Sequence, residues 1–234
     1  ADYTAPETLE IALRNVDKLM MISGSEVGQR VSQHANILSA AKKTNVKFIA
    51  YTSILNADKS KMMLATEHLA TERMIQESGI QHAFLRNSWY IENYTGQLKN
   101  VIASGGIAGA AKNGNISAAT RQDYAAAAVT VLLGGAKNNP TYELGGEAFT
   151  MQELAAVISR VSGKKVEYQD MPAGEYAQLL LSFGLPKPVA EMLSDSDVGI
   201  SRGDLYTTSD DLKKLLGRSP TSLEETIKKA LQGI

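Results

Sequence analysis

The chain contains no cysteine among its 234 residues. This absence excludes disulfide bonds, thiolate catalysis and cysteine-built metal sites, and it is compatible with a reducing compartment, so we expect a cytoplasmic protein. Long apolar runs are missing too, because no stretch approaches the roughly 20 residues that span a bilayer, and the opening residues do not follow the basic-then-apolar plan of a signal peptide. The formal net charge is only −1 and the basic residues are scattered. We therefore expect neither a membrane nor a nucleic-acid partner.

Several motifs of catalytic and nucleotide-binding sites are also absent. No Gly-x-Gly-x-x-Gly occurs, so the sequence contains no recognisable glycine-rich loop for a dinucleotide pyrophosphate. The histidines His34, His68 and His82 are isolated, without a His-x-x-x-His pair or a carboxylate at ligand spacing, so we expect no metal site. Gly24–Gly28 (GSEVG) matches neither a nucleophile elbow nor a Walker loop, and hydrolase and kinase functions therefore find no support.

What the sequence does contain is three apolar runs that change abruptly to polar, ligand-capable residues. They are Lys18–Ser25, Lys47–Ser53 and His82–Tyr94. In an open α/β sheet, ligands bind beyond the carboxyl ends of the strands. With 44% hydrophobic and 21% charged residues, the chain is long enough to form such a sheet in one large domain. The three strand ends are therefore predicted to form one site.

Segments with helical periodicity separate these runs. Thr4, followed by Pro6 and Glu7, predicts a capping-box start for a first helix, and Gly79 predicts the left-handed end of a later one. Strands that alternate with helices of this length pair in parallel, because antiparallel hairpins would not need the intervening helices. We expect an α/β fold of the Rossmann-like kind, a parallel sheet with helices on both faces. The predicted helices are 4–16, 26–45 and 62–77, and the predicted strands are 18–23, 47–52 and 81–85.

The pattern changes after Tyr94. Asn113–Gly114 predicts a hairpin turn before a short strand at Ile116–Thr120. Asp123 is the expected N-cap of an alanine-rich helix that continues to Leu133.

The last third of the chain reads as a small lobe followed by two closing helices. Capping boxes at Thr150–Glu153 and Thr221–Glu224 predict two helix starts, and Ser194–Asp197 predicts an acidic turn. We interpret residues 1–234 as a single Rossmann-type domain in which residues 150–205, approximately, form a small substrate lobe that closes over the sheet.

Several segments across the chain carry a family resemblance. They read ADY, LMMISGSEVGQR, VKFIAYTS, LRNSWYIENY, NGNISAATRQDYAAAA and SDSDVGISRGDL. Together they resemble the NmrA-like atypical short-chain dehydrogenases/reductases, and within that family most closely the bacterial NAD(P)H:quinone oxidoreductases of type 2. Family members carry the first strands and the glycine-rich phosphate loop ahead of ADY, so we expect this chain to lack its N-terminal strands. Lys18–Ser23 would then form an open sheet edge, which predicts association into homodimers or aggregation.

The resemblance also implies the ligands and the site. NADPH, or alternatively NADH, is the expected cofactor, a quinone is the expected substrate, and no flavin or metal is needed. Asp2 would contact adenine, with a frayed terminal carboxylate as the alternative; Ser25 could instead cap the next helix, and Arg121 could pair with a cofactor phosphate or with Asp123. The catalytic candidates are Asn93 and Tyr90, and the cofactor-binding candidates are Asp2, Ser23, Gly24, Ser25, Thr52, Asn87, Ser88, Trp89, Tyr90, Asn93 and Arg121.

The expected chemistry follows from a missing acid. No tyrosine has a lysine four positions later, so the acid–base pair of typical short-chain dehydrogenases is absent. Reducing an isolated ketone needs a placed acid for the alkoxide, whereas a quinone spreads the incoming charge over its ring and can take protons from water. We therefore expect hydride transfer from NADPH to a quinone, with Trp89 and Tyr90 facing the rings or simply packing the lobe onto the sheet. A non-catalytic dinucleotide-binding redox sensor and an inactive truncated product are the alternatives.

Overall fold

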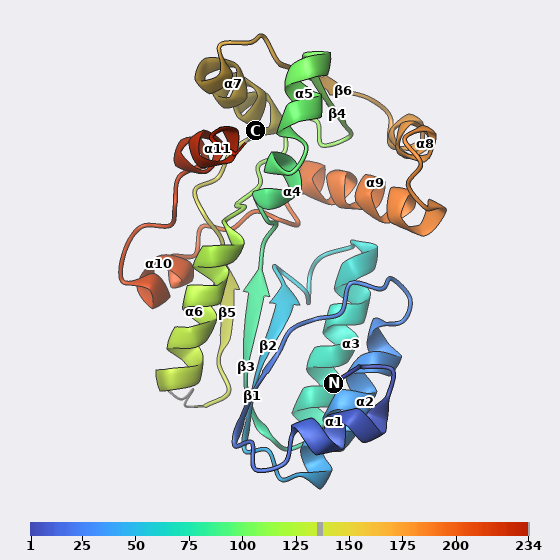
Figure 1. Cartoon of the computed structure of the whole chain (residues 1–234), viewed down its shortest axis with the longest axis vertical. Coiled ribbons are helices and arrows are strands. Elements are labelled where there is room, and N and C mark those ends of the chain that lie inside the picture. Colours follow the sequence, from blue (N-terminus) through green and yellow to red (C-terminus); the bar gives the residue numbers. More distant parts are fainter. Residues whose placement is uncertain (135–137, 234) are drawn as a thin grey trace.

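A four-stranded parallel sheet occupies the lower half of the molecule in Figure 1, with its strands in the order β1-β2-β3-β5. The structure is a computed structural model, and it describes residues 1–134 and 138–233. Neighbouring strands run parallel throughout, so their carboxyl ends meet at one edge of the sheet. The predicted parallel sheet is confirmed. Its strands are β1 (Lys18–Met21), β2 (Phe48–Ile54), β3 (Gln81–Asn87) and β5 (Thr141–Leu144).

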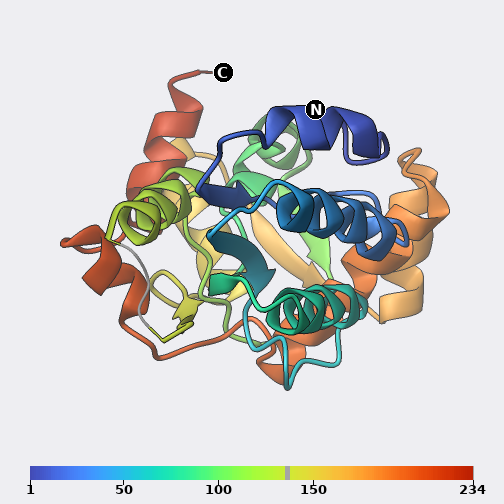
Figure 2. The same cartoon turned by 90° about the horizontal axis from the view of Figure 1, so that it is seen from below.

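Helices cover both faces of this sheet (Figure 2). Along β2, Ile49 and Tyr51 pack with buried residues of the helices on one face, whereas Phe48 and Ala50 pack with those on the other. Because successive strand side chains point to opposite faces, a strand that is buried along its whole length needs helices on both. The Rossmann-like α/β class is confirmed. One face carries α1 (Pro6–Ala12), α2 (Arg30–Lys43) and α3 (Met63–Glu77), and the other carries α6 (Arg121–Gly134) and α10 (Asp211–Leu216).

A second group of elements, the upper lobe, lies over the carboxyl ends of the strands (Figure 1). Two short strands pair in parallel within it, and its helices pack around a core that includes Leu98, Leu154 and Ile227. The upper lobe draws on residues 92–109 and 223–231 as well as on the expected segment 150–205. Its elements are α4 (Glu92–Thr95), α5 (Leu98–Ser104), β4 (Gly106–Gly109), α7 (Met151–Ser162), β6 (Glu167–Asp170), α8 (Ala173–Ser182), α9 (Lys187–Arg202) and α11 (Leu223–Leu231).

Two predicted helix starts are wrong. Thr4 does not cap α1, because its hydroxyl and its N–H both donate to the Asp2 carboxylate, and the residue before the helix, Ala5, has no capping side chain. Asp123 does not cap α6 either. The Thr120 hydroxyl accepts the Asp123 N–H at 3.1 Å and so acts as the cap, which leaves the buried Asp123 carboxylate free for other partners.

Two other capping predictions fare better. The capping box of Thr150 and Glu153 is confirmed at the start of α7, and Gly79 has the predicted left-handed conformation, with φ of +74°. The last helix, α11, is capped one residue later than expected, by Ser222, whose hydroxyl accepts the Glu225 N–H.

Two predicted turns are also wrong. Asn113–Gly114 does not close a hairpin, because β4 pairs in parallel with the distant β6, and Ile116 makes only an isolated antiparallel bridge to Phe149. A Cβ at Gly114 would lie 2.2 Å from the Ile200 carbonyl oxygen, so the glycine allows a close backbone approach rather than a hairpin. Ser194–Asp197 lies inside α9 instead of forming a turn.

β1 lies at an edge of the sheet formed by the described strands. Ile22, directly after β1, is 60% exposed. Across residues 1–134 and 138–233, no helix has both the length and the apolar character needed to cross a membrane.

Candidate active site

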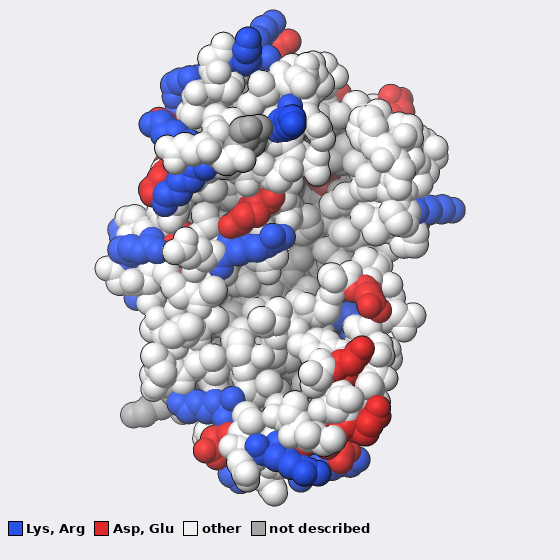
Figure 3. All heavy atoms as spheres, viewed as in Figure 1, with Lys and Arg blue, Asp and Glu red and all other residues white. Residues whose placement is uncertain are grey.

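A cavity of about 730 Å³ lies between the carboxyl ends of the strands and the upper lobe. Figure 3 shows this face of the molecule hollowed between its two halves, with few charged atoms inside the hollow. The predicted residues in it come from three strand ends, from α4 and from the start of α6. They are Ser23, Gly24, Ser25, Thr52, Asn87, Ser88, Trp89, Tyr90, Asn93 and Arg121. Asp2 is the exception, and it lies in a separate hollow of about 320 Å³ beside Gly24 and Ser25.

Asn87, the last residue of β3, lines this cavity and has an unpaired side-chain amide oxygen. The residue is only 4% exposed, and its Oδ1 atom is buried without a hydrogen-bond partner among the described residues. Buried polar atoms are nearly always paired, so an unpaired amide oxygen in a cavity wall calls for a partner that the described residues do not supply. An amide group of a ligand, which both donates and accepts, matches the Asn87 side chain.

The loop Ser23–Ser25 forms another part of the wall and is held by its backbone. The Ser23 N–H donates to the Thr52 hydroxyl at 2.8 Å, and the Gly24 carbonyl accepts from Arg30 Nε at 2.9 Å. A Cβ at Gly24 would lie 2.9 Å from the Gln33 Oε1 atom, so a larger residue would require the Gln33 side chain to move. Ser25 is not a helix cap, because α2 begins only at Arg30. The hydrogen bonds of Ser23 and Gly24 thus hold this loop in the cavity wall.

His34, on α2, also holds the loop Ser23–Ser25 in place. The Gly24 N–H donates to His34 Nε2 at 3.0 Å, so the ring proton is on Nδ1, which lies 2.9 Å from the Thr71 hydroxyl. Burial and the nearby Arg30 charge lower the pKa of His34 to about 4, which keeps the imidazole neutral and able to accept this bond. Our sequence reasoning missed this role, because the partners of His34 lie 10 and 37 residues away.

Tyr90, Asn93 and Arg121 form a polar rim on the other side of the cavity. The Arg121 guanidinium lies 5.0 Å above the Tyr90 ring and donates to Asn93 Oδ1 at 3.2 Å. The expected alternative partner of Arg121, Asp123, instead binds Arg218 at 2.6 Å. The guanidinium therefore remains at the cavity mouth, where a phosphate could reach it.

The neighbouring aromatic residues have structural contacts as well. Trp89 packs against the core of the upper lobe, and Tyr90 packs against the core on the α6 face of the sheet, with its ring 5.6 Å from that of Tyr124. Trp89 and Tyr90 therefore do make the packing contacts that the alternative interpretation predicts. Both residues also line the cavity, and packing and ligand contact are compatible for such large side chains.

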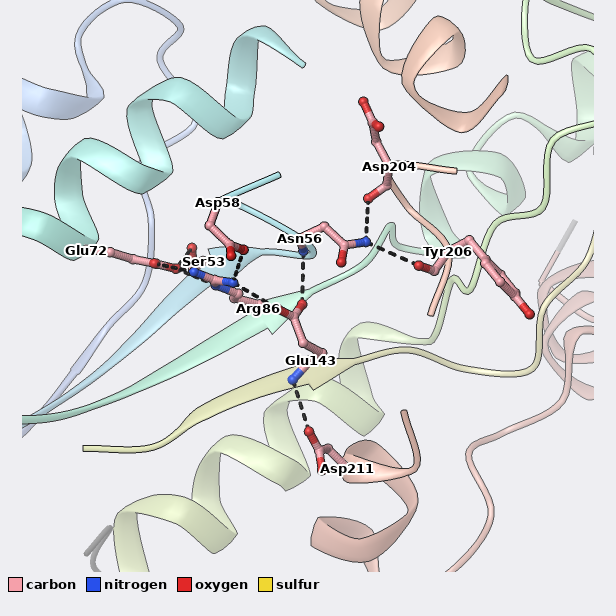
Figure 4. A network of polar contacts seen from close by, with 9 residues as sticks. All are labelled: Ser53, Asn56, Asp58, Glu72, Arg86, Glu143, Asp204, Tyr206 and Asp211. Carbon is pink, nitrogen blue, oxygen red and sulfur yellow. Dashed lines mark hydrogen bonds and ion pairs between the residues drawn. The ribbon is translucent and has the colours of Figure 1, made fainter. Parts of the chain in front are cut away.

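A buried ion-pair network supports the strand ends from behind (Figure 4). Arg86 donates two hydrogen bonds to Glu72, at 2.9 and 2.8 Å, and one to Glu143 at 2.9 Å. Burial alone would lower the pKa of Arg86, but these hydrogen bonds raise it above its usual value, so the charge is permanent. Ser53 donates to Glu72 at 2.6 Å, which fixes its hydroxyl within the network. Sequence reasoning also missed this cluster, whose members lie on β2, α3, β3 and β5.

The rest of the cavity wall is largely apolar. Met192 and Leu193 of α9 and Ala128 and Val129 of α6 line it opposite the polar strand ends. An apolar wall excludes water and leaves room for flat rings, while the few polar groups orient them. Within the described ranges, no group of three or more His, Asp or Glu side chains is arranged to hold a metal ion.

A parallel sheet with helices on both faces and a cavity at its carboxyl edge defines an α/β protein of the Rossmann-like class. The model of the NmrA-like family matches residues 1–231. The chain belongs to the NmrA-like family.

Three comparisons describe its similarity to known members. It is 48% identical over 228 residues to quinone oxidoreductase 2 of Escherichia coli (strain K12), a match that covers 97% of this chain and 80% of the relative. The crystal structure of NADPH-dependent quinone oxidoreductase QOR2 from E. coli, complexed with NADPH, is similar with a TM-score of 0.95 and 47% identity, covering 99% of this chain and 82% of the other. The Citrobacter sp. triphenylmethane reductase complexed with NADP(H) has a TM-score of 0.91 and 40% identity, covering 98% and 82%.

Proposed function

We propose that the protein is an NADPH-dependent oxidoreductase that reduces a quinone to a hydroquinone. The observation that carries this proposal is the unpaired amide of Asn87 at the end of a central strand, inside a cavity with one polar and one apolar wall. The similarity to an E. coli quinone oxidoreductase that binds NADPH supports the same conclusion. The donor and acceptor amide atoms of Asn87 fit a carboxamide such as that of nicotinamide.

Each part of the cavity has a role in this reaction. When bound, NADPH supplies a hydride from its nicotinamide ring. We assign Ser23–Ser25 and Thr52 to the cofactor, together with Asn87 and Ser88, because they surround the strand ends. Trp89 offers a flat face to a ring, and Arg121 offers a charge to a cofactor phosphate. Asp2, in its separate hollow, remains a candidate contact to adenine.

The reaction itself needs little acid–base machinery. The quinone gains one hydride and one proton, and the cofactor leaves oxidised, so atoms and electrons balance without a flavin or metal. Asn93 and Tyr90 lie at the mouth of the cavity, where they would orient the quinone. The protein's contribution is to hold both rings face to face in a dry cleft.

The test is the oxidation of NADPH, followed by its absorbance, with 1,4-benzoquinone and no added flavin. We expect turnover in the wild type and a loss of at least tenfold in kcat/KM for Asn87→Ala, because the buried amide pairs only with the ligand. Asn100→Ala is the matched control, because the Asn100 side chain is exposed on α5 and bonds only to Gln97. NADPH binding without turnover would instead support the redox sensor, and the absence of both would support the inactive product. NADH in place of NADPH measures the cofactor preference.

We further propose that the protein forms homodimers through the β1 edge. β1 lies at the border of the described sheet, with the exposed Ile22 beside it, and open parallel edges favour association. Light scattering tests this expectation, and a monomer at high concentration would contradict it.

A further inference from the structure

A second histidine, His68, lies in the wall of the same cavity and has one free ring nitrogen. It belongs to α3, and only 6% of its surface is exposed. Its Nδ1 atom lies 2.8 Å from the Tyr51 hydroxyl. Among the described residues its Nε2 atom has no hydrogen-bond partner, yet it is not among the fully buried unpaired atoms. The exposed part of the ring therefore includes Nε2, on the side that lines the cavity.

The surroundings of His68 determine where its proton is. Tyr51 is completely buried in the middle of β2, and burial raises the pKa of its phenol, so the phenol keeps its proton. Burial, with the charge of Arg30, lowers the pKa of His68 well below its usual value, so the imidazole is neutral. A buried hydroxyl needs an acceptor, and His68 Nδ1, at 2.8 Å, is the atom in hydrogen-bonding geometry with the Tyr51 hydroxyl. The remaining ring proton is then on Nε2.

Aromatic packing holds the His68 ring in its orientation toward the cavity. The Tyr51 ring lies between the two histidines, 5.6 Å from His34 and 5.9 Å from His68. The hydroxyls of β2 cannot replace His68 in the cavity, because Ser53 donates to Glu72 and Thr52 is bonded to Ser23. His68 is thus a fixed, neutral N–H donor at a point where the neighbouring strand offers none.

We propose that His68 is a further ligand-binding residue of this site, whose Nε2–H donates a hydrogen bond to an oxygen atom of the bound ligand. This inference rests on the proposed function. The oxygen is either a ribose hydroxyl of the dinucleotide or a carbonyl oxygen of the quinone, since both accept a hydrogen bond in the same way. If it is the quinone carbonyl, the bond strengthens as the hydride arrives, because negative charge develops on that oxygen. A neutral histidine suits this role, since it needs no desolvated charge.

The experiment compares His68→Leu, His68→Gln and His68→Asn with the wild type. Gln places its side-chain N–H close to the position of Nε2, whereas Asn is too short and Leu has no donor. The control is His82→Leu, because His82 is equally buried but lies on β3 at the opposite end of the sheet, with its Nδ1 bonded to the Ile80 carbonyl. The dissociation constant for NADPH is measured without quinone, and kcat/KM for 1,4-benzoquinone is measured at saturating NADPH.

We expect His68→Leu to weaken one of these two quantities by about tenfold, the effect of one lost hydrogen bond in a dry site. Loss in the dissociation constant assigns the bond to the dinucleotide, and loss in kcat/KM for the quinone assigns it to the substrate. His68→Gln should recover most of the loss and His68→Asn should not. Tyr51→Phe should weaken the same quantity by a smaller factor, because it removes the hydrogen bond to His68 Nδ1 but leaves the His68 ring in place.

Two results would overturn the proposal. One is a His68→Leu protein with both quantities equal to those of His82→Leu. The other is that His68→Gln and His68→Asn give equal values of both quantities. This result would overturn the proposal even if His68→Leu does not fold. A wild type that binds NADPH but reduces no quinone would refute the proposed function alone, since the NADPH measurements would still decide the role of His68.

Discussion

Removal of the Arg86 side chain tests the network behind the strand ends most directly. Arg86→Met keeps an unbranched apolar side chain in place of the arginine stem but removes the guanidinium, so Glu72 loses its charge partner. The Glu72 side chain is 3% exposed and accepts two hydrogen bonds from Arg86 and one from Ser53. A buried carboxylate stranded in this way is strongly unfavourable, because neither water nor another cation can reach it.

The expected loss of stability is large. Removing one partner of a buried pair costs about 3–5 kcal/mol, which for a chain of this size lowers Tm by roughly 6–20 °C. Thermal unfolding followed by circular dichroism measures it. Arg160→Met is the matched control: Arg160 pairs with Glu224 at 2.7 Å, but its side chain is 59% exposed. Exposed pairs of this kind contribute about 0.2–1 kcal/mol.

Equal Tm values for the two variants would refute the reasoning, because the network would then contribute no more than a surface pair. A double variant separates the lost attraction from the stranded charge. Arg86→Met combined with Glu72→Met replaces the buried pair by apolar side chains, and we expect it to be more stable than Arg86→Met alone. A double variant less stable than the single one would contradict this, because it would show that the Glu72 carboxylate stabilises the fold even without Arg86, through its hydrogen bond from Ser53.

Three further predictions concern the cavity itself. Between its folded pKa of about 4 and its ordinary value of 6.5, His34 binds more protons in the unfolded chain than in the folded one. The free energy of unfolding therefore falls as the pH drops through that window, by at most about 3 kcal/mol. Urea titrations should find a smaller pH dependence for His34→Gln than for the wild type, and an identical one would contradict this account. Arg121→Gln should raise KM for NADPH about tenfold if the guanidinium binds a phosphate, and an unchanged KM would leave it with Tyr90 and Asn93 alone. Asn93→Ala should lower kcat about tenfold in the benzoquinone assay, whereas an unchanged rate would remove Asn93 from the site.

The sequence was sufficient wherever structure is determined by local pattern. The apolar run Lys47–Ser53 predicts a central strand, and the strand is buried at every position. The capping box at Thr150 and the left-handed Gly79 were correct for the same reason, because each depends on residues within one helical turn. Thr120, three residues before Asp123, carries the same kind of signal, and we would have placed that cap correctly by reading it as we read Thr150.

The errors arise where distant contacts override local preference. Ser194–Asp197 has the composition of a turn, yet Ser196 donates to the Met192 carbonyl inside α9, and the Asp197 carboxylate accepts the Ala110 N–H from the other side of the upper lobe. These contacts compensate for the low helix propensity of the segment Ser194–Asp197. The Arg86 cluster could not be predicted for the same reason. It also includes Asp58, which pairs with Arg86 at 2.5 Å, and Asp58 and Glu143 are separated by 85 positions along the chain.

The cavity wall has two kinds of residue, and only one kind was visible in the sequence. Residues at strand ends, such as Asn87 and Thr52, follow apolar runs and can be located by that pattern. Residues on helices occupy ordinary helical positions: His68 lines the cavity, whereas His34 lies behind the wall and binds the Gly24 N–H. The first kind would contact the ligand directly, and the second fixes the loop and supplies a further donor. A catalytic geometry depends on both kinds of residue. Strand-end residues position a ligand precisely only if their own backbone is held precisely. Sequence pattern therefore locates this site, while its precision is set by the helices α2 and α3, which no local motif connects to it.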